Sequence, residues 1–207
     1  MTTDNDHRRD ERRVHRGGRK VPKPLDAQTL NDLALGYVAR FATSGGRLGD
    51  YLKRKLRERG WAGDSDTDGA NASAPPDVAG VVERLVALGY IDDAGFAQAR
   101  GAGLMRRGYG ARRIAETLGR DGIDAPLVAQ ASGNDHARRT AALAFARRRR
   151  LGPFGPGSGG NRLDPAARAK QVSALMRAGH PLAFARALVE AVDEAAAQEW
   201  VDDADDS

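Results

Sequence analysis

Asp92 and Asp93 form a pair of adjacent carboxylates, a combination that acid–base or metal-dependent chemistry could use. The pair follows Gly89 and Tyr90, and a glycine followed by an apolar residue is typical of a helix end. An aspartate placed directly after such an end can accept hydrogen bonds from the free N–H groups of the next helix. We therefore interpret the two aspartates as a helix cap rather than as a catalytic site.

The segment Gly108-Tyr109-Gly110 is similar to a phosphate-binding turn ahead of a helix N-terminus. It lacks the preceding strand and the full glycine pattern of a nucleotide site, so a turn between two helices is the better interpretation. The chain has no cysteine, P-loop, HExxH sequence or Ser/His/Asp arrangement. Its histidines are His7, His15, His136 and His180. We expect no enzymatic activity, no cofactor and no metal site.

Two pairs of arginines flank this turn, which should hold them near one another. Arg106 and Arg107 end one predicted helix, where positive charge is favourable. Arg112 and Arg113 open the next helix, where positive charge is unfavourable. The unfavourable position indicates a binding surface, although Arg112 could instead pair with Glu116 one turn later.

Two further basic runs could extend this surface, and the sequence leaves open whether they share a face with it. The candidate partner- or DNA-binding residues are Arg106, Arg107, Tyr109, Arg112, Arg113, Lys53, Arg54, Lys55, Arg147, Arg148, Arg149 and Arg150. Because no Phe or Trp lies within the basic runs, the sequence does not support recognition of stacked bases.

Apolar residues at helical spacing predict the elements that carry these positions. Helix caps are predicted at Asp26, Asp77 and Asp164, with a break in the chain at 43–46. Three of the predicted helices end alike, at Gly60-Trp61, Gly122-Ile123 and Gly179-His180. This recurrence indicates three-helix repeats, whose amphipathic helices must stack on neighbours to bury their apolar faces. We expect an all-α protein whose tandem three-helix units form an elongated, curved helical array.

The predicted division of the chain follows these repeats. A disordered basic arm occupies residues 1–25, and an acidic tail occupies residues 193–207. The repeats span 26–90, 91–133 and 134–192, with a mobile loop at 62–76 in the first and a Gly/Pro-rich loop at 151–162 in the third. If the tail shields the basic body, its removal should strengthen non-specific DNA binding.

The net charge of +5 conceals an asymmetry, because residues 193–207 contain seven acidic residues and no basic one. The basic remainder favours a polyanion or the acidic face of a protein as partner. No apolar run approaches the ~20 residues of a membrane span, and the N-terminus has no apolar signal core. These features predict a cytoplasmic protein.

The segment 84–123 resembles the RecX family, which comprises bacterial proteins that regulate the recombinase RecA. The resemblance combines the two-aspartate cap, the Gly-Tyr-Gly turn and a helix that opens with paired arginines. Its signature positions, which we interpret as capping and core residues, are Gly89, Tyr90, Asp92, Asp93, Phe96, Gly108, Gly110 and Ile114. The chain departs from the family pattern at Ala111, where a proline is expected, and at Gly101 and Gly103, each costing about 1 kcal/mol within a helix.

The resemblance implies a monomeric regulatory protein that binds RecA and its filament on single-stranded DNA. Such a protein would mainly inhibit the RecA ATPase, filament growth and recombination, and so regulate DNA repair and the SOS response. Direct contact with phosphates of single- or double-stranded DNA stays open. The alternative is a free-standing helical DNA-binding module or transcription regulator. A helical adaptor that binds neither DNA nor RecA is a third possibility.

Overall fold

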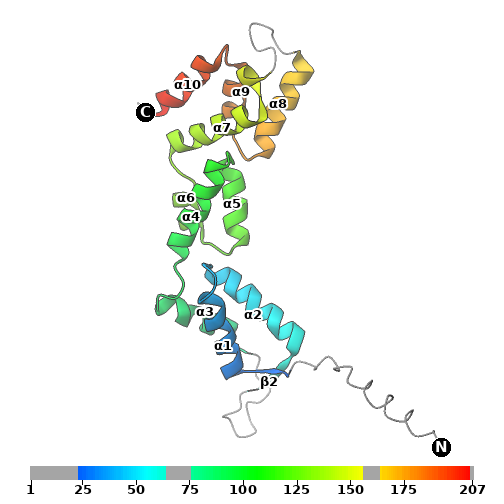
Figure 1. Ribbon diagram of the computed structural model, residues 1–207, viewed down its shortest axis with the longest axis vertical. Helices are drawn as coiled ribbons and strands as arrows, with labels where there is room; N and C mark the ends of the chain where they lie inside the picture. The colour runs from blue at the N-terminus through cyan, green and yellow to red at the C-terminus, as the bar shows by residue number, and fades with distance from the viewer. Residues whose placement is uncertain (1–22, 64–75, 156–163, 206–207) are drawn as a thin grey trace, which may run out of the picture.

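The computed structural model describes residues 23–63, 76–155 and 164–205. Within these ranges, ten α-helices form three units placed one after another along an elongated, shallowly curved array (Figure 1). The all-α repeat architecture predicted from the sequence is therefore confirmed. Residues 1–22 of the predicted basic arm, and most of the two predicted loops, lie outside the described residues.

The bounds of the elements follow the three units. Unit 1 contains β1 (Leu25–Asp26), α1 (Ala27–Val38), α2 (Gly45–Arg59), β2 (Trp61–Gly63) and α3 (Val78–Ala87). Unit 2 contains α4 (Asp93–Arg106), α5 (Ala111–Arg120) and α6 (Ala125–Ala131). Unit 3 contains α7 (Asp135–Arg149), the 3-10 helix η1 (Gly152–Phe154), α8 (Pro165–Arg177), α9 (Leu182–Glu190), α10 (Glu194–Asp202) and the 3-10 helix η2 (Asp203–Asp205).

Each unit has its own apolar core, to which its middle helix (α2, α5 or α8) contributes fully buried side chains. These residues are Leu48 and Leu52 of α2, Ile114 and Leu118 of α5, and Leu175 of α8. Each such burial contributes roughly 1.5–3 kcal/mol relative to an exposed side chain. Because one stripe of each middle helix faces inward, its opposite face is left for solvent or for a partner.

Local hydrogen bonds start most of the helices. Asp26, Asp77 and Asp164 accept from the backbone N–H three residues later, as their predicted capping roles require. At α2 the prediction was wrong, because the helix already begins at Gly45, inside the predicted break. Ser44 precedes it, and the Ser44 hydroxyl accepts from the Arg47 N–H.

Unit 1 joins unit 2 where the start of α2 meets the turn between α5 and α6. The Ser44 hydroxyl donates to the backbone carbonyl of Asp121, and the Gly45 N–H donates to the Asp93 carboxylate at 2.9 Å. Gly46 lies so close to Gly122 that a Cβ on Gly46 would come within 2.6 Å of the Gly122 Cα. Only a residue without a side chain fits there.

Unit 2 joins unit 3 in the corresponding way, where the start of α5 meets the turn between α8 and α9. The Gly110 N–H donates to the Ala178 carbonyl at 3.0 Å, and the Arg112 N–H donates to the Gly179 carbonyl at 3.3 Å. A Cβ on Gly110 would overlap the backbone of Gly179 and His180. The recurrent glycine ends at Gly122 and Gly179 therefore serve to join successive units, which the sequence did not indicate.

His180 is buried in this second joint with 4% of its surface exposed. Its Nε2 lies 3.0 Å from the Gly108 carbonyl, and its ring is 6.0 Å from that of Phe145. Because a carbonyl only accepts, Nε2 carries the proton. Burial lowers the pKa of His180 from its ordinary value of 6.5, and the hydrogen bond to Gly108 opposes this effect.

This burial predicts that the protein loses stability when the pH falls below about 6.5. Above that pH the histidine is neutral in both folded and unfolded chains, and stability is highest. Below it the unfolded chain takes up a proton that the folded chain resists, down to the lowered pKa. Urea unfolding between pH 7.5 and 5.0 should show a slope of up to about 1.4 kcal/mol per pH unit. His180→Gln, whose amide can still donate to Gly108, should flatten the slope, and an unchanged slope would contradict the assignment.

Unit 3 differs from the other two because it contains a fourth α-helix. Residues 193–207, predicted as an acidic tail, include α10, which packs beside α7 (Figure 1). Ala197 and Val201 of α10 are buried in the core of unit 3 at 0% and 1% exposure. Their spacing of four residues places them on one face, while the acidic residues occupy the others. The acidic composition concealed this apolar face.

The only strands within the described residues form one parallel pair in unit 1, with Leu25 opposite Trp61. The Leu25 N–H donates to the Gly60 carbonyl at 2.9 Å. Gly60-Trp61 in unit 1 corresponds to Gly122-Ile123 and Gly179-His180, which join units 2 and 3 to the unit before each of them. In unit 1, β1 therefore lies where the preceding unit lies in the other two. None of the helices in the described ranges is long and apolar enough to cross a membrane.

Candidate partner-binding surface

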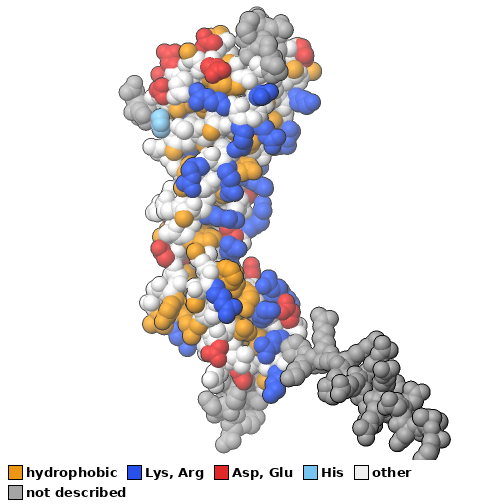
Figure 2. All heavy atoms as spheres, viewed as in Figure 1, with side chains coloured by type: hydrophobic (Ala, Val, Ile, Leu, Met, Phe, Trp, Pro, Cys, Tyr) orange, Lys and Arg blue, Asp and Glu red, His pale blue; other side chains and the backbone are white. Residues whose placement is uncertain are grey.

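The middle helices α2, α5 and α8 lie along one side of the array (Figure 1). On each of them Lys and Arg outnumber Asp and Glu. Figure 2 shows Lys and Arg side chains gathered along this side, from unit 1 to unit 3. We call it the basic side. The positive charge extends along the whole array because each unit places its basic middle helix on this same side.

In unit 1, α2 contributes the predicted run Lys53, Arg54 and Lys55. The Glu58 carboxylate accepts from Lys55 Nζ at 2.7 Å and lies 3.7 Å from Arg54 Nε. The hydrogen bond from Lys55 holds the pKa of Glu58 below its usual value. Lys53 is exposed and has no ion-pair partner among the described residues. The run therefore keeps a surplus of positive charge.

In unit 2, Glu116 is surrounded by three arginines of α5. Arg112 Nη1 donates to it at 3.0 Å, while Arg113 and Arg120 lie 3.5 and 4.0 Å away. Arg112 Nη2 also donates to the Met176 carbonyl at the end of α8, 2.8 Å away. The position of Arg112 at a helix N-terminus is thus compensated within the protein. One carboxylate against three guanidinium groups leaves α5 positively charged.

In unit 3, the exposed Lys170 and Arg177 and the half-buried Arg168 of α8 continue the basic side. Sequence reasoning did not select these residues because they are dispersed rather than consecutive. Arg120 was missed for the same reason. The signal that could have found them is the position of each within the middle helix of a repeat.

The remaining candidates of unit 2 lie at the end of α4. Arg106 and Arg107 are exposed, and Arg107 Nε donates to the Gly103 carbonyl of its own helix at 3.1 Å. Tyr109 is half-buried against the core of unit 2. Tyr109 therefore contributes mainly to packing, and the two arginines remain available at the surface.

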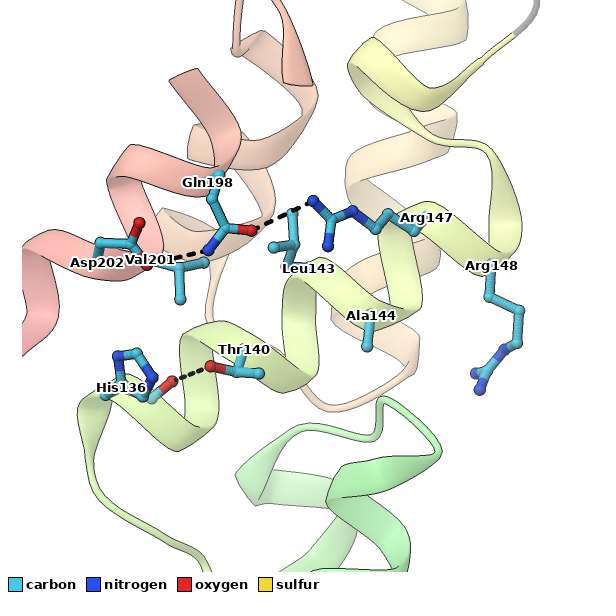
Figure 3. Close-up of a pocket in the computed structure, with 9 residues that line it drawn as sticks. All are labelled: His136, Thr140, Leu143, Ala144, Arg147, Arg148, Gln198, Val201 and Asp202. Carbon is cyan, nitrogen blue, oxygen red and sulfur yellow. Dashed lines mark hydrogen bonds between the residues drawn. The ribbon is translucent and has the colours of Figure 1, made fainter. Parts of the chain in front are cut away.

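The run Arg147–Arg150 ends α7, which is not a middle helix. Arg147 points across a hollow of about 510 Å³ toward α10, where its Nη2 donates to Gln198 Oε1 at 3.2 Å (Figure 3). Arg148 is another of the residues that line this hollow (Figure 3). The guanidinium groups of Arg148 and Arg149 lie 5.6 and 5.9 Å from the centre of the Phe145 ring. Arg150 is the left-handed C-cap of the helix, with φ of 54°.

The signature residues have distinct positions. Gly89, at φ 75°, ends α3, and the Asp92 carboxylate caps α4 by accepting from the Gly95 N–H at 2.8 Å. Asp93 does not cap that helix but reaches unit 1 through Gly45. Phe96 lies under the Arg47 guanidinium at 5.8 Å. The interpretation of Tyr90 as a core residue was wrong, because this side chain is 58% exposed.

Glycines fill the closest contacts of unit 2. A Cβ on Gly108, which has φ of 75°, would lie 2.8 Å from the backbone N of Phe145 in α7. A Cβ on Gly101 would overlap the Ala131 carbonyl of α6. Gly101 thus permits close packing of α4 on α6, which offsets its low helix propensity. Gly110 precedes α5 without a side-chain cap, and Ile114 is fully buried.

Aromatic rings lie beside the basic residues despite their absence from the basic runs. Arg54 and Lys55 lie 5.5 and 5.9 Å from the centre of the Tyr51 ring. Tyr51 stacks on Tyr37 with ring centres 4.4 Å apart. The sequence-based argument against base stacking considered only Phe and Trp within the basic runs. Tyr51 lies on α2 itself, about one turn before Arg54 and Lys55, and the fold adds the ring of Tyr37 from α1.

Sequence and structure comparisons connect these features to known proteins. Residues 92–131 match the family model of the second three-helix domain of RecX. Regulatory protein RecX of Myxococcus xanthus (strain DK1622) is 29% identical over 177 residues, covering 84% of this chain and 90% of the relative. The crystal structure of RecX from Lactobacillus salivarius aligns with a TM-score of 0.57 and 15% identity, over 80% of this chain and 95% of that chain. This last likeness concerns the fold.

Proposed function

We propose that this chain, like the RecX regulatory proteins that it resembles, binds RecA and the filament that RecA forms on single-stranded DNA. It slows ATP hydrolysis and filament growth, and so restrains recombination, DNA repair and the SOS response in the cytoplasm. The observation that carries the proposal is the basic side, which runs through all three units of a RecX-like fold.

The shape and the charge of the array support this mode of action. A nucleoprotein filament presents similar surfaces at regular intervals, and three units in a row can contact several of them at once. Each contact can be weak, because linked contacts reinforce one another. Phosphates and acidic side chains are the groups that Lys and Arg on the basic side would contact. The protein would then act by occupying the filament rather than by chemistry of its own.

The proposal is tested by adding the protein to RecA of the same organism on single-stranded DNA. We expect the rate of ATP hydrolysis and the filament length, measured by electron microscopy, to fall as the protein concentration rises. Lys53→Glu, Arg120→Glu and Lys170→Glu each reverse one charge on the basic side. Each should raise the concentration for half-inhibition by roughly tenfold.

Arg186→Glu is the matched control, because Arg186 is exposed on α9, outside the middle helices. It should inhibit like the unchanged protein, and circular dichroism should show the same helix content for all variants. Unchanged hydrolysis and filament length at an excess of protein would refute the proposal. Tight, sequence-selective binding to duplex DNA without RecA would instead support a free-standing DNA-binding module.

A further inference from the structure

A hollow of about 420 Å³ opens on unit 1 between the end of α1 and the start of α2. It is lined by Tyr37, Arg40, Phe41, Ala42 and Arg47. Its volume falls in the range of small-ligand sites. The lining combines aromatic rings with two guanidinium groups, so it suits a ligand that is both flat and negatively charged.

The aromatic part of the hollow is a series of three rings. Tyr51 stacks on Tyr37 at an interplanar angle of 24°, and Phe41 lies tilted against Tyr37 with ring centres 5.2 Å apart. At the Tyr51 end, Arg54 and Lys55 cover the ring. At the other end Phe41 is 57% exposed, although it is a large apolar side chain. The series is therefore covered at one end and open at the other.

The cationic part comes from Arg40 and Arg47. Arg40 is exposed and has no carboxylate partner among the described residues. The side chain of Arg47 is 42% exposed and lies 3.8 Å from Asp121, which also pairs with Arg100 at 3.3 Å. Asp121 thus shares its charge between two arginines, and the hollow keeps a net positive charge that an anionic group can neutralise.

We propose that this hollow binds one nucleotide of single-stranded DNA, with the base stacked on Phe41 and the phosphate held by Arg40 and Arg47. A base has a flat face that extends the ring series. Its phosphate supplies the anionic partner that Arg40 lacks and that Arg47 has only in Asp121, which also pairs with Arg100. An acidic protein segment would satisfy the arginines but would leave Phe41 uncovered. The strand continues along α2, where Lys53 and Arg54 contact the next phosphates.

The choice of DNA over RNA rests on the proposed function, whereas the stacked nucleotide does not depend on RecA. The binding site is therefore tested without RecA. Fluorescence anisotropy would measure the affinity of the full-length protein for a labelled twenty-nucleotide oligothymidylate. Phe41→Ala is expected to weaken binding roughly tenfold, and Phe41→Trp should retain it. Arg40→Gln should lower the slope of log affinity against log salt concentration by the amount that corresponds to about one phosphate contact.

The control is Leu35→Ala, which removes an exposed apolar side chain of α1 that is not among the residues lining the hollow, and this variant should bind like the unchanged protein. An abasic strand of equal length separates base from phosphate contacts, because Phe41→Ala should then bind as well as the unchanged protein. Equal losses on the two strands, or no loss for Phe41→Ala, would overturn the stacked base. If polyglutamate displaced the strand equally well from the unchanged protein and from Phe41→Ala, the hollow would instead be a site for an acidic protein segment. Tighter binding of oligouridylate would overturn the assignment to DNA.

Discussion

Replacing Gly110 with alanine is expected to separate unit 2 from unit 3. The backbone at Gly110 has φ of −80°, which alanine adopts readily, so the effect comes from space alone. The new Cβ would overlap the backbone of Gly179 and His180, which cannot move aside as a flexible side chain could. Overpacking typically costs 1–3 kcal/mol, and about 3 kcal/mol or more is expected here because the two hydrogen bonds of the joint must also lengthen.

Urea unfolding would measure this loss, and small-angle X-ray scattering would detect the changed arrangement of the units. Gly46→Ala should act in the same way on the joint between units 1 and 2, where the Gly122 Cα blocks the added carbon. The matched control is Gly119→Ala in α5, because nothing lies within 4 Å of its Cβ position. It should stabilise the helix by about 1 kcal/mol. If Gly110→Ala were as stable as Gly119→Ala, the joint would not depend on this close approach.

Features that depend on neighbouring residues could be predicted from the sequence. Asp26 and Asp164 cap helices through the N–H three residues later, so the signal and the contact lie in one short segment. The same is true of the helix end at Gly89, where a left-handed glycine is required. The apolar stripes of the middle helices are likewise local, and they led to the three-unit array.

Features that depend on residues far apart in the chain could not be predicted. Asp93 resembles a second capping residue, and only the fold shows that its carboxylate accepts from Gly45, 48 residues away. Gly101 appears unfavourable until Ala131 of α6 is placed against it. The ring series of unit 1 joins Tyr37 of α1 with Tyr51 of α2, which no periodic pattern indicates. Contacts between residues so far apart in the chain produce no regular spacing in the sequence from which they could be predicted.

The candidate surface illustrates both cases. The basic run at Lys53 and the pair Arg112 and Arg113 of α5 could be found because charged residues cluster there in the sequence, whereas the isolated Arg120 of the same helix could not. Arg112 was correctly given an alternative partner in Glu116, but its hydrogen bond to Met176 also makes it part of a joint. Variants of Arg112 would therefore mix binding with stability. The proposed test accordingly uses Lys53, Arg120 and Lys170, which lie outside the joints.

Ending the chain after Val192 is expected to destabilise unit 3 rather than merely remove negative charge. The truncation deletes Val201 and Ala197 from the core. It also removes Trp200, whose ring packs against Phe184 at 5.1 Å and whose carbonyl accepts from Arg139 at 2.7 Å. Losing these contacts should cost about 3–5 kcal/mol. Hydrogen exchange would show reduced protection in α7 and α9, with units 1 and 2 less affected.

A full-length variant distinguishes this loss of packing from loss of electrostatic shielding. Glu199→Gln combined with Asp203→Asn removes two exposed charges from this region and leaves the buried face of α10 intact. If acidic groups shield the basic side, this variant should bind non-specific DNA more tightly while unfolding at the same urea concentration as the unchanged protein. The truncated chain should instead unfold at a lower concentration. Equal stability of the truncated and full-length chains would show that α10 contributes little to unit 3, and any gain in DNA binding would then come from charge alone.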